Sequence, residues 1–295
     1  MFRKLILCLR LLITRPTKKL FRALGYDIVR LGQVPPPPLP PSPPEPTAGP
    51  LATNAVLRRI YWDGVVEDRE GNVVADARMA AIKLEDGELL YNIVSSIRPE
   101  RTLEVGLAYG GSTLFICEAL RSNGTGYHTA MDPYQHSSYH DVGLLNVERA
   151  GFESMVTFYD EESCQVLPRL LAEGQHYGFM FIDGDHRFDG ILIDFYYADK
   201  MLEPGGFLVL HDMDHASVQK AASFILRNRA YALVPPIHMK APPFMRRFGE
   251  FLKNVVRTPL EPLLWPYYSI KAPHLCIVFQ KTGDDHRFWT HYKSF

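Results

Sequence analysis

From about residue 80 onward, short runs that favour β-strands alternate with longer segments whose apolar residues lie on one side. Five short runs follow one another at 102–105, 127–131, 156–159, 177–182 and 207–210, and two more close the series at 231–234 and 274–280. Between them lie segments with apolar residues at helical spacing, at 80–97, 114–120, 142–150, 164–172, 188–201 and 218–227. The run at 177–182 is strongly apolar, as is typical of a parallel strand buried on both faces. The alternation predicts an α/β fold with a mostly parallel sheet and helices on both faces.

The first 33 residues have a different pattern, because basic and apolar side chains dominate them. No acid precedes Asp27, and apolar side chains recur at helical spacing at Phe2, Leu5, Leu9 and Leu12. This predicts a cationic amphipathic helix whose apolar run is well short of the ~20 residues that cross a bilayer. Two interpretations stay open for residues 1–31: packing on the protein's own domain or a partner protein, and peripheral contact with an anionic membrane face.

Prolines dominate residues 34–50, which excludes a helix or a central strand there and predicts a semi-rigid linker. We therefore expect three parts: the basic segment 1–33, the linker 34–50 and a domain at 51–295. An insertion rich in aromatic residues and arginine interrupts the domain at about 235–273, between the last two expected strands. It is open to three interpretations: a lid, a substrate-recognition element, or a contact in a homo-oligomer.

Charge and cysteine content narrow the class of protein. The 295 residues carry a formal net charge of −1, which argues against attraction of the whole protein to nucleic acid. The four cysteines are scattered without a C-x-x-C pair, so we expect a reducing compartment and neither a disulfide framework nor a zinc site. The expected location is the cytoplasm, with the membrane surface as the alternative that the basic segment leaves open.

Residues 102–113 combine a short strand, a glycine-rich loop and the start of a helix. Gly106, Gly110 and Gly111 end the strand, and Ser112 and Thr113 are good N-cap residues for the helix. Such a loop brings backbone N–H groups and a helix N-terminus toward a ligand that carries oxygens. The spacing does not fit the G-x-G-x-x-G of dinucleotide-binding folds. A tight turn that needs glycine for steric reasons alone remains the other interpretation.

Acidic residues recur where successive expected strands end: Glu104, Asp132, Glu161 or Glu162, Asp183 and Asp212. In an open parallel sheet these ends form one edge, where ligands bind. A row of carboxylates there suits a nucleoside with a diol and a cationic tail, and it offers oxygen ligands to a hard cation such as Mg²⁺. Capping of the following loops is the alternative for Asp183 and Asp212.

Three segments together resemble a known family: Leu-Glu-Val-Gly-Leu-Ala-Tyr-Gly-Gly-Ser-Thr at 103–113, Phe-Ile-Asp-Gly-Asp-His at 181–186, and Leu-Glu-Pro-Gly-Gly-Phe-Leu-Val-Leu-His-Asp at 202–212. With the Gly-Glu-Leu-Leu run at 87–90, they are similar to class I S-adenosylmethionine (SAM)-dependent methyltransferases of the small-molecule O-methyltransferase type. The resemblance covers about 80–226. It implies a Rossmann-like, doubly wound, mostly parallel seven-stranded sheet with a final antiparallel strand pair.

By that resemblance each motif position carries an expected role. The methionine end of SAM would contact Glu104, Gly106, Ala108, Tyr109, Gly110, Gly111 and Ser112. Asp132 would take the ribose hydroxyls, and Glu162 and Ser163 would border the adenine. Asp183 would contact the cofactor and serve in catalysis, and Asp183 and Asp212 match the two metal-binding acids of the divalent-cation-dependent branch. His186 matches a histidine proposed as the base in sugar-modifying relatives.

One position departs from the metal-dependent pattern, because Met213 stands where catechol-type relatives have asparagine. A thioether is a poor ligand for a hard cation, so either His211 or Asp214 completes the shell or no metal binds. The resulting hypothesis is a SAM-dependent methyltransferase, with Mg²⁺ as a second cofactor, that acts on a hydroxyl of a small molecule or a glycan. A catalytically silent scaffold and a different enzyme on the same fold, such as an aminopropyl transferase, are the alternatives.

Overall fold

The computed structural model describes residues 48–76, 81–234 and 276–295. The basic segment 1–33, most of the linker and the insertion at 235–273 lie outside the described residues. The described part begins with two short helices, one π-helical turn and a hairpin: α3 (Pro50–Thr53), α4 (Ala55–Arg58), η1 (Arg59–Asp63), β1 (Val65–Glu67) and β2 (Val73–Asp76). None of the helices described is long and apolar enough to cross a membrane.

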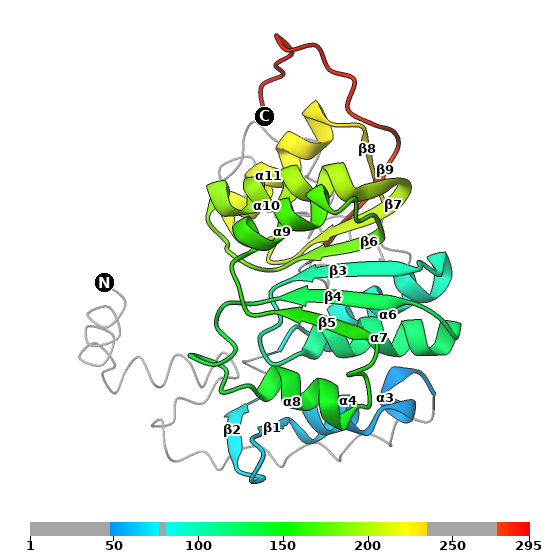
Figure 1. Ribbon diagram of the computed structural model, residues 1–295, viewed down its shortest axis with the longest axis vertical. Helices are drawn as coiled ribbons and strands as arrows, with labels where there is room; N and C mark the ends of the chain where they lie inside the picture. The colour runs from blue at the N-terminus through cyan, green and yellow to red at the C-terminus, as the bar shows by residue number, and fades with distance from the viewer. Residues whose placement is uncertain (1–47, 77–80, 235–275) are drawn as a thin grey trace, which may run out of the picture. The chain divides into compact units, whose positions relative to one another are not determined.

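The centre of the molecule is a seven-stranded sheet (Figure 1), formed by β3 (Arg101–Val105), β4 (Tyr127–Met131), β5 (Val156–Tyr159), β6 (Tyr177–Ile182), β7 (Leu202–Leu210), β8 (Tyr231–Leu233) and β9 (Ile277–Lys281). The spatial order is β5-β4-β3-β6-β7-β9-β8. Strands β3 to β7 pair in parallel, whereas β9 runs antiparallel to both β7 and β8. The prediction of a mostly parallel seven-stranded sheet with a final antiparallel pair is confirmed.

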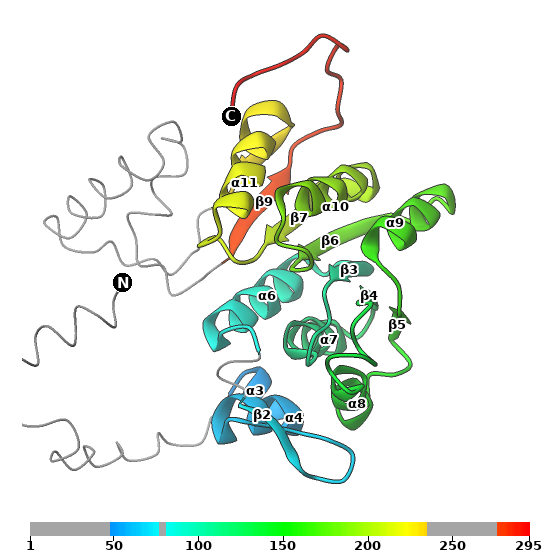
Figure 2. The same cartoon turned by 90° about the vertical axis from the view of Figure 1, so that its left-hand side faces the viewer.

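Helices cover both faces of this sheet (Figure 2): α6 (Leu84–Ile97), α7 (Gly111–Asn123), α8 (Val142–Arg149), α9 (Ser163–Ala172), α10 (Phe188–Met201) and α11 (Ala216–Asn228). Neighbouring side chains of one strand point to opposite faces, and β6 shows the result. Its Phe179 and Phe181 pack in a core with α6 and α7, whereas Met180 and Ile182 pack in a core with α9, α10 and α11. The continuous apolar run of β6 therefore serves two cores at once.

Several elements differ from the sequence prediction in extent, three of them as follows. The segment expected at 80–97 is helical only from Leu84 within the described residues. Strand β7 begins at Leu202 rather than at residue 207, because pairing with β6 continues across an irregularity in register between Tyr177 and Phe179. The last strand runs from Ile277 to Lys281 rather than over 274–280.

Helix α7 is not the one-sided amphipathic helix that the sequence predicts. Every residue from Gly111 to Leu120 is buried, because α6 covers one side while the short N-terminal helices and α8 cover another. The helix also starts earlier than expected, with Gly110 as its N-cap in a left-handed conformation. Ser112 and Thr113 lie inside the first turn, where their hydroxyls bond a strand residue instead of capping the helix.

Candidate active site

The strand register brings the predicted acids to one edge of the sheet. Val105 on β3 pairs with Met131 on β4 and with Ile182 on β6, and Ile182 in turn pairs with Leu210 on β7. The residues that follow these strand ends include Asp132, Asp183 and Asp212, which therefore lie along the same edge. Strand order reverses at β3, so the glycine loop stands where open α/β sheets bind their ligands.

Two cavities adjoin at this edge, each with a volume of about 370 Å³. The first cavity is lined by acidic, small polar and apolar side chains, among them Met131, Asp132, Pro133, Glu162, Ser163, Cys164, Asp185, Ile193 and Asp194. The second is lined by the glycine loop and by polar side chains, among them Lys83, Tyr109, Gly111, Ser112, His186, His211 and Asp212. Gly106, Ala108, Tyr139, Asp183 and Gly184 line both. Cavities of this size suit a small-molecule ligand.

Packing within the protein, without any ligand, explains why position 106 is a glycine. Gly106 has a φ of 97°, and a Cβ there would lie 2.3 Å from the carbonyl oxygen of Asp183. The loop after β3 therefore rests directly on the end of β6, and any side chain at 106 would separate the two. Gly110 likewise has a φ of 82° and faces Gly143 O, 3.1 Å from an added Cβ.

Glu104 lies beneath the glycine loop and lines neither cavity. It is fully buried, and its carboxylate accepts hydrogen bonds from the hydroxyls of Ser112 and Thr113. His128 Nε2 on β4 lies 3.1 Å from the same carboxylate. Glu104 thus ties β3 to the first turn of α7, and its predicted contact with the methionine end would act through Ser112, which lines the second cavity.

Asp132 lines the first cavity and at the same time shapes the loop. Its Oδ2 accepts hydrogen bonds from the backbone N–H groups of Leu107 and Ala108, at 3.1 and 2.7 Å, and its Oδ1 accepts one from Tyr134 N at 2.8 Å. Carboxylates satisfied by several N–H donors are held firmly in one orientation. The predicted contact of Asp132 with a ribose diol would add to these bonds or replace one of them.

Asp183 and Asp212 form a cluster with two histidines. The Oδ1 of Asp183 lies 3.1 Å from His211 Nδ1 and 3.3 Å from His186 Nε2. Both histidines also lie 3.2 Å from an oxygen of Asp212. The backbone of Asp212 has a φ of 54°, a conformation that is uncommon for a residue other than glycine and turns the chain sharply after β7.

The cluster shifts the pKa values of its members. Burial alone would raise the pKa of Asp183, but hydrogen bonds from His186 and His211 outweigh it and hold that pKa below its usual value. The hydrogen bond with Asp183 raises the pKa of His186. Burial opposes the charge on His211, yet the hydrogen bond with Asp183 and the nearby carboxylate of Asp86 raise the pKa of His211 to about 10. Carboxylate and imidazole thus stabilise each other's charged forms.

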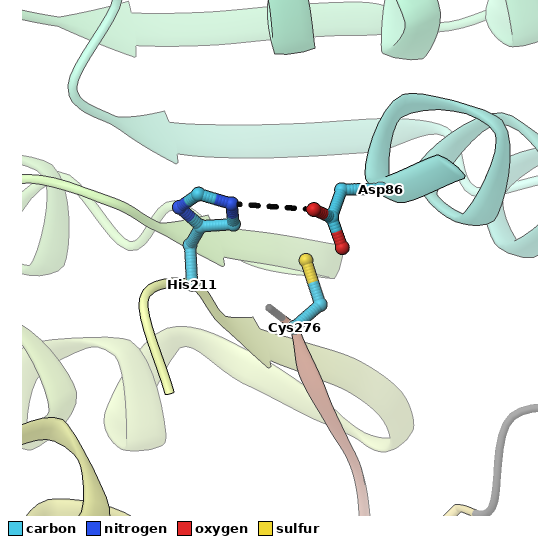
Figure 3. A group of neighbouring side chains, drawn as sticks. All are labelled: Asp86, His211 and Cys276. Atoms are coloured by element: carbon cyan, nitrogen blue, oxygen red, sulfur yellow. Dashed lines mark ion pairs between the residues drawn. The ribbon is translucent and has the colours of Figure 1, made fainter. Parts of the chain in front are cut away.

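Sequence reasoning missed Asp86 and Cys276, which surround His211 on its buried side (Figure 3). Asp86 comes from α6, and its Oδ2 lies 3.6 Å from His211 Nε2. Cys276 stands just before β9, next to Asp86, and burial raises the pKa of its thiol. The signal for Asp86 was its place beside the Gly-Glu-Leu-Leu run. Tyr139 was missed as well, although it lines both cavities and contacts Tyr109 edge-on at 5.0 Å.

The donor set of the cluster is compatible with a divalent metal. One ligand atom each from Asp183, His211 and Asp212 lie within 4.8 Å of one another. Met213 packs in the hydrophobic core and offers nothing to the site, and Asp214 is exposed and bonds His215. Of the two neighbours considered as a third ligand, His211 is the one in position. Two carboxylates with an imidazole fit a borderline metal at least as well as Mg²⁺.

A known protein family matches the central part of the chain. The methyltransferase domain family matches residues 103–213, a segment that contains the glycine loop, Asp132 and both acids of the cluster. This part of the chain is therefore similar to methyltransferase domains.

Among the curated relatives, the caffeoyl-CoA O-methyltransferase of Stellaria longipes is 34% identical over 102 residues, which are 34% of this chain and 41% of that protein. The catechol O-methyltransferase of Niastella koreensis is 32% identical over 117 residues, or 39% and 51% of the two chains. The chain therefore spans about half or less of the length of these relatives. A solved structure of an O-methyltransferase from Klebsiella pneumoniae aligns with a TM-score of 0.49 at 19% identity, over 61% of this chain and 81% of that one.

Proposed function

We propose that this protein is a SAM-dependent methyltransferase that transfers a methyl group to a hydroxyl of a small molecule or a sugar-containing substrate. The main support for this proposal is that the two cavities share the residues that separate them. Gly106 and Asp183 stand in the wall between the cavities, with acids and apolar groups on one side and the histidine cluster on the other. A donor bound in the first cavity would present its reactive end to an acceptor in the second. The matched family supports this assignment.

The methyl group of a sulfonium is already activated, so the protein has to align the two reactants and remove the acceptor proton. His186 is half-exposed at the rim of the second cavity, with its Nε2 near both Asp183 and Asp212. Its neutral form is suited to accept the proton of an acceptor hydroxyl, while the two carboxylates stabilise the imidazolium that results. Asp183, held by His186 and His211, orients that base.

We also propose that Asp183, Asp212 and His211 hold a divalent metal. Such an ion would supply a Lewis acid that lowers the pKa of a bound hydroxyl. His211 is itself fixed from behind by Asp86, a partner of the kind that commonly orients a metal-ligating histidine.

Binding of S-adenosylhomocysteine, the product of methyl transfer, tests the first half of the proposal. Ile193 on α10 lines the first cavity although 42% of its surface is exposed, so Ile193→Glu should fold and place a charge in the cavity. We expect calorimetric affinity to fall at least about tenfold, since a buried charge against an apolar ligand face is costly. Tyr196→Glu on the same helix, exposed and outside the cavity, is the matched control. Equal affinity of both variants and the parent would place the ligand elsewhere.

A further inference from the structure

The three most exposed large hydrophobic side chains of the described residues lie close together in the sequence near the C-terminus. Phe288, Trp289 and Tyr292 have 69, 86 and 75% of their surface exposed. The ring centroids of Phe288 and Trp289 are 5.7 Å apart, and His291 N donates a hydrogen bond of 2.8 Å to Phe288 O, which closes a turn between these rings and Tyr292. Single exposed apolar side chains are normal, whereas a group of them marks a contact with a partner or a membrane.

The loop that carries these rings is fixed to the domain at both ends. At its start Asp285 pairs with Arg229, and Arg287 Nε lies 2.7 Å from the same carboxylate. At its end the buried Asn228 of α11 exchanges two hydrogen bonds of 3.0 Å with the backbone of Lys293. In both views the chain after β9 forms an open loop that returns to α11 (Figures 1 and 2). The order of the loop therefore does not depend on burial of its aromatic rings.

A fourth aromatic ring of the same segment points the other way. Phe295 packs on Phe224 of α11 and Phe188 of α10, with ring centroids 5.1 and 6.4 Å apart. Phe295 thus holds the end of the segment to the domain, whereas the three rings before it are left to the solvent.

The charge of the loop favours an anionic lipid surface as its partner. Residues 286–293 contain one arginine, one lysine and two histidines but no acid. The two acids just before them are paired at the base of the loop, since Asp284 lies 3.2 Å from Lys281 and Asp285 pairs with Arg229. Tryptophan and tyrosine rings next to cationic side chains are typical of segments in the interfacial layer of a membrane. The basic and apolar sequence of residues 1–33 is a second feature that anionic membranes attract.

We infer that the aromatic loop, residues 286–293, is a membrane-contacting element that inserts Phe288, Trp289 and Tyr292 among the headgroups of an anionic lipid surface. Insertion removes the apolar rings from water, while the lysine and the histidines stay close to the lipid phosphates. The contact is peripheral, because a loop of this length cannot cross a bilayer. The inference does not depend on methyl transfer.

Fluorescence quenching by lipid tests the position of Trp289 directly. The full chain is mixed with vesicles of phosphatidylserine and phosphatidylcholine in equal parts, with or without bromine on the upper acyl chain, which quenches tryptophans that enter the membrane. Trp289→Phe keeps an apolar ring but removes this fluorophore, while the other two tryptophans of the chain remain. We expect the parent to lose a larger share of its emission than Trp289→Phe. Equal losses, or no loss in either protein, would overturn the inference.

Vesicle sedimentation then measures what the three rings contribute together. Their replacement by serine should lower the partition of the full chain onto the same vesicles at least about tenfold, because the apolar surface that enters the membrane is lost. All three positions are exposed, so the variant should melt at the temperature of the parent. Undiminished partition of the folded variant, or no partition of the parent, would overturn the inference.

A matched variant removes three exposed apolar side chains elsewhere on the domain: Val73→Ser, Tyr127→Ser and Tyr196→Ser. It should bind the vesicles like the parent, and a loss equal to that of the loop variant would overturn a specific role of the loop. Sedimentation velocity without lipid tests the other occupant of the aromatic loop, a second copy of this chain. A dimer of the parent that the loop variant loses would assign the rings to that contact and overturn the inference.

Discussion

At the scale of single residues, the structure distinguishes acids whose oxygens bond other groups of the protein from acids with an oxygen that does not. The sequence alone does not make this distinction. The sequence predicts acids and glycines at one edge of the sheet, and Asp132, Asp183 and Asp212 all lie there. It does not say which of them serve the protein itself. Glu104 is hydrogen-bonded by Ser112, Thr113 and His128, whereas Asp194, an ordinary helix residue in the sequence, has a buried oxygen without a hydrogen-bond partner among the described residues. Such differences depend on side-chain contacts between distant segments.

The buried charge of Asp194 should cost stability in the ligand-free protein. Burial raises the pKa of Asp194 from 3.8 to about 6. Below pH 4 the acid is protonated in both the folded and unfolded states and contributes nothing. As the pH rises toward 6 the unfolded state ionises first, so stability is lost, and above pH 6 the loss is complete. Asp194→Asn should therefore raise the free energy of unfolding by up to roughly 3 kcal/mol at pH 7.5.

Urea denaturation of parent and variant at pH 7.5 and pH 4.5 measures this difference. The gain of Asp194→Asn should shrink at the lower pH, because the parent regains stability when Asp194 is protonated. Asp189→Asn, at an exposed position of the same helix, should change little at either pH. A gain that is equal at both pH values would contradict a raised pKa as its cause.

His186 is expected to limit the rate as the base of the reaction. His186→Ala should lower kcat by roughly 10²–10⁴-fold. The raised pKa of His186 should place the acidic limb of the parent's kcat profile above the pH of an ordinary histidine, because the imidazolium cannot accept a proton. His215→Ala is the control, since His215 stacks on His186 at 5.1 Å but is exposed. Full activity of His186→Ala would exclude it as the base.

At the scale of elements, the hydrophobic pattern predicts type and order better than extent. Strands β4, β5 and β6 and helix α10 have the bounds that the pattern predicts, because an aspartate directly follows each of the three strands and Pro204 stands shortly after the helix. The start of β7 was missed, since Pro204, Gly205 and Gly206 resemble a turn while the strand pairs on either side of them. The full burial of α7 was missed because the covering segments precede residue 80 and carry weak patterns.

The β3–α7 unit should depend on Glu104 for stability. Glu104→Gln places an amide donor where two hydroxyl donors now point, so at least one buried hydrogen bond is lost. We expect the free energy of unfolding to fall by about 1–3 kcal/mol, the usual cost of an unsatisfied buried group. Glu153→Gln, at an exposed position before β5, is the control for urea denaturation. Parent-like stability of Glu104→Gln would show that the buried carboxylate does not hold the loop.

At the scale of the whole molecule, we propose that the catalytic domain begins before residue 51. Helix α3 starts at Pro50, and Leu51 is buried. Thr53 and Asn54 both donate hydrogen bonds to Glu118 on α7, at 2.7 and 3.1 Å. The polyproline pattern predicts a linker, but no sequence signal revealed that the residues just after it clamp the central helix.

Two truncations should therefore behave differently. A chain that begins at residue 48 should melt like the full-length protein and bind S-adenosylhomocysteine equally well, because α3 and α4 remain. A chain that begins at residue 55 loses both donors to Glu118, which is 1% exposed, and should lose about 2–4 kcal/mol of stability. Insoluble or unfolded protein from the chain that begins at residue 48 would show that the preceding segment belongs to the core.

Methyl transfer itself is the most direct measurement of the central claim. The full chain is incubated with SAM carrying an isotopically labelled methyl group, a panel of phenolic and sugar acceptors, and either EDTA, Mg²⁺ or Mn²⁺. Mass spectrometry then follows the label. We expect S-adenosylhomocysteine together with a product that carries the labelled methyl group on a hydroxyl, and we expect His186→Ala to suppress that product. Tight binding of S-adenosylhomocysteine with no transfer to any hydroxylated acceptor under any of these conditions would contradict an O-methyltransferase and favour a binding protein on this fold.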